Sequence, residues 1–84
     1  ASDVYKRQRL DNDDITKLIL NFSGVTFMDS SGIGVVIGRY KKITMKNGSL
    51  SVVSVSSRVK KIFELSGMYK IIKEFGTIEE ALEN

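Results

Sequence analysis

The 84 residues of this chain include no cysteine and no histidine. Without cysteine there is no disulfide bond and no thiolate metal site. Without histidine the chain cannot assemble a Ser-His-Asp relay, which sets aside serine-nucleophile catalysis of that kind. We expect a chain that is not an enzyme, with no catalytic residue, no metal ion and no cofactor.

Long apolar runs are also missing. No run approaches the roughly 18 consecutive apolar residues that a transmembrane helix requires. The N-terminus is polar and charged and lacks the apolar segment of a signal peptide. With the absence of cysteine, these features fit a protein of the cytoplasm without a membrane partner.

Most of the positive net charge lies at the N-terminal end of the chain. The formal net charge is +3, and residues 1–9 supply +2 of it with three bases and one acid. The rest of the chain holds ten basic and nine acidic residues, without the aromatic-interleaved basic stripe of a nucleic-acid interface. We therefore expect no direct binding to nucleic acid.

What is present fits one small globular domain. The hydrophobic fraction is 42% and the charged fraction 27%, both ordinary for such a domain. The length is close to the lower limit at which one core suffices.

Three segments are predicted to be strands. Residues 15–22 contain the continuous apolar run Leu18-Ile19-Leu20, typical of a strand buried on both faces. Residues 50–55 alternate and are rich in β-branched side chains, and a third short strand is expected within residues 68–75, around Ile71 and Ile72. Because helical segments separate the strands, we predict an α/β fold with a mostly parallel sheet and crossover helices.

The longest predicted helix covers residues 33–45. Asn47 and Gly48 follow it, and Gly48 is expected to end it in the left-handed conformation. A short extended piece, residues 25–28, is expected before it.

Two further helices are predicted. One follows a cap at Ser56-Ser57 and ends at Gly67, and the other begins at Thr77, which has capping-box spacing to Glu80. The inward-facing residues predicted for the three helices, in chain order, are Ile33, Val36, Ile37, Tyr40 and Ile43; Val59, Ile62, Phe63 and Leu65; and Ile78, Ala81 and Leu82.

The junction between the first strand and the long helix, residues 25–34, is the candidate functional site. Asp29, Ser30 and Ser31 lie where the helix starts, and a helix start offers unpaired N–H groups and the positive end of the dipole. The anion that it suits is either Asp29 or a phosphate carried on Ser30 or Ser31. The same three residues are equally typical of a simple helix cap.

Glycines are frequent in this helix although each costs roughly 1 kcal/mol relative to alanine. Gly34 and Gly38 share a face, which favours close packing of the helix on the sheet. Gly32 lies in the first turn, where a missing side chain exposes the backbone to a partner or an anion.

The motif Phe-Met-Asp-Ser-Ser-Gly-Ile-Gly at residues 27–34, continued through residue 41, resembles the signature of STAS domains. More narrowly, it is similar to the anti-anti-sigma factors (anti-sigma factor antagonists) of spore-forming bacteria. Residues 59–72 resemble the same family, and the resemblance covers roughly residues 10–82.

This resemblance implies a regulator of transcription in sporulation. In the family, the unphosphorylated protein binds an anti-sigma factor that is also a serine kinase, and so frees the sigma factor. Phosphorylation inactivates it, and a serine phosphatase restores it. The resemblance implies that Ser30, the first serine after Asp29, is the phosphorylated residue. The partner-binding residues that it implies are Asp29, Ser31, Gly32, Ile33 and Gly34.

The front of the chain departs from the family pattern. Residues 1–9 do not match, tolerate a helix and precede a turn predicted at residues 11–14. We expect residues 10–84 to form a partial STAS domain that lacks the first two family strands. Residues 17–22 would then form an unpaired sheet edge, which favours self-association of the chain.

A second class of function stays open: a ligand- or nucleotide-sensing STAS domain, as found in transporters and stressosome-type assemblies. A glycine-rich junction would serve that use too, although the junction lacks the lysine of a P-loop.

Overall fold

The computed structural model describes residues 2–10 and 13–84, with side-chain detail from residue 17 onward. It contains a four-stranded sheet in the order β1-β2-β3-β4. The strands are β1 (Ser2–Leu10), β2 (Asp13–Asn21), β3 (Ser49–Val53) and β4 (Lys73–Phe75). The helices are α1 (Ser30–Thr44), α2 (Ser57–Ser66), the 3-10 turn η1 (Met68–Lys70) and α3 (Ile78–Glu83).

The predicted parallel core of the sheet is confirmed. β2 pairs with β3, and β3 with β4, in parallel. The connections that carry α1 and α2 join these parallel neighbours, as crossover units require.

The N-terminal segment differs from its prediction. Its composition tolerates a helix over residues 1–9, but Ser2–Leu10 is a strand antiparallel to β2 over nine residue pairs. The predicted unpaired edge at residues 17–22 is therefore wrong, since β1 occupies it. Of the turn predicted at residues 11–14, residues 11 and 12 lie outside the described residues, and Asp13 and Asp14 belong to β2.

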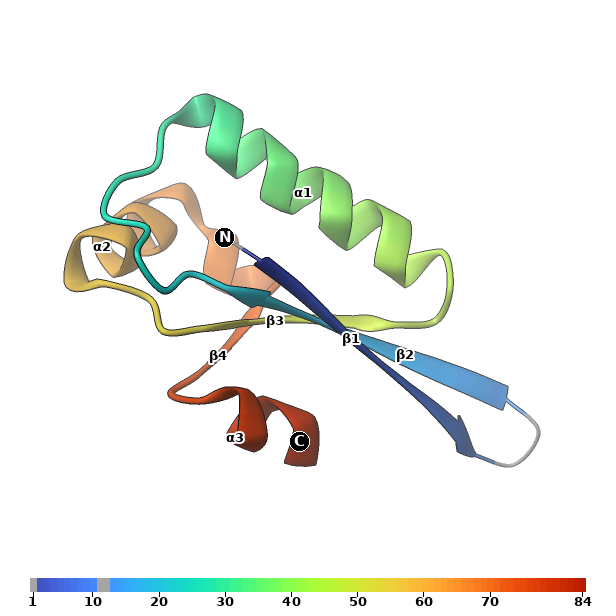
Figure 1. Ribbon diagram of the computed structural model, residues 1–84. Coiled ribbons are helices and arrows are strands. Elements are labelled where there is room, and N and C mark those ends of the chain that lie inside the picture. The colour runs from blue at the N-terminus through green and yellow to red at the C-terminus, as the bar shows by residue number, and fades with distance from the viewer. Residues whose placement is uncertain (1, 11–12) are drawn as a thin grey trace.

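Helices cover both faces of the sheet (Figure 1). α1 and α2 lie over one face and α3 over the other. The larger core lies under α1 and α2 and consists of Leu18, Leu20, Phe22, Val36, Ile43, Leu50, Val52, Val59, Phe63, Met68 and Ile72. The smaller core, under α3, consists of Ile19, Val53 and Ala81. Alternate residues of β2 enter opposite cores, which explains the continuous apolar run.

Three local predictions need correction. The helix α1 is followed by a turn in which Asn47 has the positive φ of 56°, and Gly48 is not among the positive-φ glycines. Leu65 points away from the core and is 80% exposed. The third strand is limited to residues 73–75, because Met68–Lys70 forms a 3-10 turn that places Met68 and Ile72 in the larger core.

The other helix ends are as predicted. Ser56 caps α2 and accepts from the Val59 amide at 3.3 Å, and Gly67 ends α2 with a left-handed φ of 75°. Thr77 caps α3 by accepting from the Glu80 amide at 3.2 Å.

Candidate functional site

The junction begins where β2 leaves the sheet. Phe22 continues the pairing by donating its amide to the Val53 carbonyl at 3.0 Å. A turn follows in which Gly24 has φ 82° and the Val25 amide donates back to the Phe22 carbonyl at 2.9 Å. Residues 25–29 then form a loop without strand pairing, so the short extended piece expected at residues 25–28 is not a strand.

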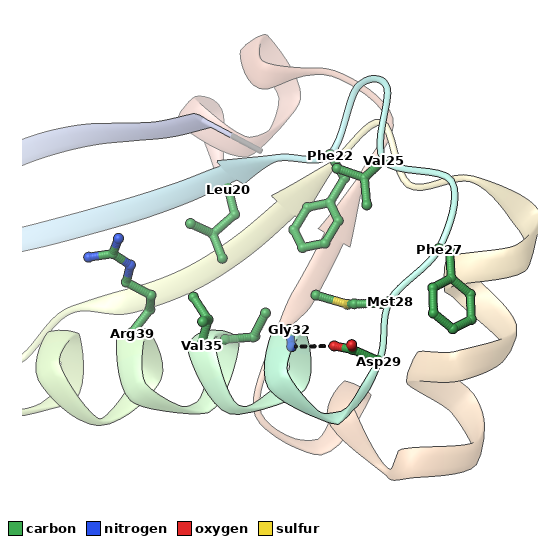
Figure 2. Close-up of a pocket in the computed structure, with 10 residues that line it drawn as sticks. Leu20, Phe22, Val25, Phe27, Met28, Asp29, Gly32, Val35 and Arg39 are labelled. Atoms are coloured by element: carbon green, nitrogen blue, oxygen red, sulfur yellow. Dashed lines mark hydrogen bonds between the residues drawn. The ribbon is translucent and has the colours of Figure 1, made fainter.

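Asp29 is the residue that caps α1. Its backbone is extended, with φ −103° and ψ −172°, and its Oδ1 accepts from the Gly32 amide at 3.1 Å (Figure 2). Its carbonyl accepts the first helical bond, from the Ile33 amide at 3.1 Å. Of the three candidate caps, the structure therefore selects Asp29, and the carboxylate lies at the positive end of the helix dipole.

Ser30 and Ser31 are the first two residues of α1, and both are exposed. Neither acts as the cap, since Asp29 holds that position. Ser30 is thus exposed to solvent at the start of a helix that the Asp29 side chain caps.

The glycines of α1 differ in their surroundings. A Cβ at Gly32 would lie 2.7 Å from Met28 Cγ, so Gly32 allows the loop to pack closely on the helix. A Cβ at Gly34 or Gly38 would meet nothing within 4 Å. Close packing on the sheet therefore explains neither Gly34 nor Gly38.

A pocket of about 400 Å³ lies beside the junction, between the loop and α1 (Figure 2). Its lining residues are Leu20, Phe22, Val25, Phe27, Met28, Asp29, Gly32, Val35, Val36 and Arg39. Leu20, Phe22 and Val36 belong to the buried core, whereas Phe27 is 62% exposed and Val35 is 59% exposed. The buried part of the pocket is thus apolar, and exposed apolar side chains form its margin.

The charges around the junction are unequal. Asp29 is the only acidic residue between positions 22 and 46, and the same segment carries Arg39, Lys41, Lys42 and Lys46. The three lysines are exposed. The start of α1 therefore carries one negative charge, whereas its second half and the turn after it are basic.

The structure places the predicted site residues at the start of α1, where they differ in exposure. Asp29, Ser30, Ser31 and Gly34 are exposed, whereas Gly32 and Ile33 are half-buried, and Ile33 packs against the larger core. Phe27 and Val35, which line the pocket, are not among the site residues predicted from the sequence. Two features of the sequence could have indicated them: Phe27 is an aromatic residue in a loop, and Val35 lies outside the apolar face of the helix.

Comparison with known proteins places these features in a family. A family model described as the STAS domain matches residues 4–81. The match includes residues 4–9, so the prediction that residues 1–9 lie outside the family pattern is wrong for these six residues. Among the described residues, no helix is long and apolar enough to cross a membrane.

Two curated relatives and one solved structure are similar to the chain. The "Anti-sigma F factor antagonist" of Paenibacillus polymyxa is 38% identical over 65 residues, which are 77% of this chain and 56% of the relative. The "Anti-sigma-B factor antagonist" of Bacillus subtilis is 38% identical over 48 residues, 57% of this chain and 44% of the relative. The chain thus spans about half the length of these relatives.

The structure of an anti-sigma-factor antagonist (STAS) domain protein from Planctomyces limnophilus superimposes with a TM-score of 0.72 at 14% identity, covering 93% of this chain and 94% of that one. At that identity the likeness concerns the fold alone.

Proposed function

This chain belongs to the STAS domain family, and we propose that it is an anti-sigma factor antagonist that binds an anti-sigma serine kinase through the junction at residues 25–34. In this proposal the unphosphorylated chain frees a sigma factor in the cytoplasm. Phosphorylation of Ser30 by the kinase ends binding, and a serine phosphatase restores it. The partner-binding residues are Asp29, Ser31, Gly32, Ile33 and Gly34.

One observation supports this proposal above the others: Ser30 is exposed on the first turn of α1, directly after the capping Asp29. A kinase can reach such a hydroxyl without unfolding the chain. The names of the relatives from P. polymyxa and B. subtilis support the antagonist role.

The physical basis of the switch is electrostatic. A phosphate on Ser30 adds about 1.5 to 2 negative charges. At the start of α1 the helix dipole favours this charge, so the fold tolerates it. In an interface the phosphate has to lose water next to the Asp29 carboxylate, which opposes binding.

Two variants test the proposal by titration calorimetry against the cognate anti-sigma factor. Ser30→Ala is expected to bind as the unphosphorylated wild type does. Ser30→Asp is expected to keep the thermal melt of the wild type and to bind at least about tenfold more weakly, a loss of roughly 1.4 kcal/mol. Equal affinity of the two variants contradicts the switch.

Incubation with the kinase and ATP then locates the phosphate by mass spectrometry. We expect it on Ser30 in the wild type and in Ser31→Ala, and nowhere in Ser30→Ala. Phosphate on Ser31 of the wild type would reverse the assignment, and its complete absence would favour a ligand- or nucleotide-sensing STAS domain.

A further inference from the structure

We propose that the pocket beside the junction receives a bulky apolar side chain of the anti-sigma factor, and that acidic residues of the same partner flank this side chain. The inference rests on the proposed function and adds the chemistry by which the partner is recognised.

The pocket is suited to an apolar group. Its buried lining residues, Leu20, Phe22 and Val36, are fixed by the larger core, so the cavity is preformed. The half-buried Val25 and Met28 complete the apolar wall. A volume of about 400 Å³ accommodates a large aliphatic or aromatic side chain, and such anchors in preformed pockets dominate binding at many interfaces.

The margin of the pocket favours a protein over a small molecule. Phe27 and Val35 remain 62% and 59% exposed, on the loop and on α1 respectively. A small ligand inside the cavity would leave the outer parts of both side chains in water. A protein surface seated over the pocket would cover both, and burial of exposed apolar area is the main favourable contribution to such association.

Charge complementarity defines the partner further. On the side of the pocket toward the end of α1, the exposed surface carries Lys41, Lys42 and Lys46, and no acidic residue lies between Ser30 and Asn47. A partner with acidic residues beside its apolar anchor meets this basic surface favourably, and one with basic residues is repelled.

The pocket also connects recognition to the switch. Asp29 lines the pocket and directly precedes Ser30. A phosphate on Ser30 therefore adds charge beside the opening that an apolar side chain has to enter. Desolvation of that charge opposes the same step that fills the pocket.

Alanine variants of the margin test the apolar part. All are made in a Ser30→Ala background, so that phosphorylation cannot change the binding, and the Kd for the cognate anti-sigma factor is measured by calorimetry. Phe27→Ala and Val35→Ala are each expected to raise Kd by at least about fivefold. Leu65→Ala is the matched control, since Leu65 is an equally apolar residue that is 80% exposed on α2 and does not line the pocket. Its Kd is expected to stay within about twofold of the background.

Charge reversal tests the electrostatic part. Lys42→Glu is expected to raise Kd and to reduce the dependence of Kd on salt, whereas Lys61→Glu, an exposed lysine on α2, changes both little. Val35→Ala and Lys42→Glu replace exposed side chains, so both are informative even if Phe27→Ala alters the loop.

The outcomes separate the two proposals. Failure of the Ser30→Ala chain to bind the anti-sigma factor overturns the proposed function. If that chain binds, but Phe27→Ala and Val35→Ala keep its Kd, the pocket inference is wrong. The appearance of a small molecule bound to the purified wild-type chain in native mass spectrometry, together with unchanged Kd values, would assign the pocket to that molecule instead.

Discussion

At the scale of single residues, the start of α1 depends on one carboxylate rather than on the serines beside it. Asp29 accepts from the Gly32 amide, while Ser30 and Ser31 direct exposed side chains from the first turn. The sequence alone does not distinguish Asp29, Ser30 and Ser31 as the cap, because each is a favourable capping residue. Which of them caps the helix depends on where the preceding loop ends. In the structure the loop ends at Asp29, with Met28 packed against Gly32 of the first turn.

We expect Asp29→Ala to lower the free energy of unfolding by about 1 kcal/mol, because the Gly32 amide loses its partner. Asp29→Asn keeps a capping oxygen and should retain most of that stability. Ser31→Ala should change the free energy by less than about 0.5 kcal/mol, since its hydroxyl does not cap the helix. Urea denaturation measures all three. A larger loss in Ser31→Ala than in Asp29→Ala would contradict this description of the helix start.

The glycines of α1 give an independent prediction. Gly34→Ala and Gly38→Ala should each raise the free energy of unfolding by about 0.5 to 1 kcal/mol, because alanine is the better helix former and its Cβ meets nothing within 4 Å. Gly32→Ala should gain less or lose stability, because its Cβ would displace Met28 from a 2.7 Å approach. Thermal melts of the three variants compare these effects directly. Destabilisation by Gly34→Ala would contradict the open space around Gly34.

At the scale of elements, α2, η1 and β4 are joined by a polar and aromatic cluster. The hydroxyl of Tyr69 donates to Glu74, and Lys60 pairs with the same carboxylate at 3.1 Å. The Tyr69 ring packs edge-on against Phe63, with centroids 5.8 Å apart. Burial, followed by the hydrogen bond to Glu74, raises the pKa of Tyr69 well above its ordinary value.

This raised pKa predicts how stability depends on pH. Below the ordinary tyrosine pKa of about 10, the hydroxyl is neutral in the folded and unfolded chain, and its contribution is fully present. Above pH about 10 the unfolded chain ionises first, so the free energy of unfolding falls until pH passes the folded pKa. Tyr69→Phe keeps the ring and should reduce this decline. Denaturation between pH 9 and about 12 measures it, and absorbance of tyrosinate should show Tyr69 ionising above the ordinary range. An unchanged alkaline decline in Tyr69→Phe would assign it to other groups.

The elements also show where sequence patterns suffice. α1 and α2 were predictable because their apolar residues recur at helical spacing, and burial of Val36, Val59 and Phe63 confirms it. β2 and β3 were predictable from short apolar segments, although residues 50–53 of β3 are buried consecutively and not in the alternation predicted for them. β4 was misplaced because its neighbouring apolar pair, Ile71 and Ile72, precedes the strand, and Ile72 enters the core from the turn. β1 was missed because a charged segment becomes a strand only by pairing with β2, a tertiary contact that local composition does not encode.

At the scale of the whole molecule, β1 determines what the sheet exposes. The mismatch of residues 1–9 with the family pattern predicts an unpaired edge at residues 17–22 and self-association through it. In the structure, Lys17–Asn21 has β1 on one side and β3 on the other. In contrast, residues 13–16 of β2 pair only with β1, and this hairpin extends past the end of α1 in Figure 1. β1 therefore covers the edge that β2 would otherwise expose, and it does so through antiparallel pairing with the strand that follows it in the chain.

We therefore expect the 84-residue chain to be a monomer with one cooperative thermal transition, in place of the self-association that an open β2 edge would cause. Deletion of residues 1–10 removes β1 and leaves unpaired those N–H and C=O groups of β2 that face β1, beside the buried Leu18, Ile19 and Leu20. Such an edge is a template for pairing with another chain, so the shortened chain should self-associate or lose its cooperative transition. Sedimentation velocity and thermal melts of the two chains, at several concentrations, measure both properties. As a control, deletion of residues 83–84 removes only the exposed end of α3 and should leave both unchanged. A monomeric, cooperatively melting chain without residues 1–10 would show that β1 is dispensable for the sheet.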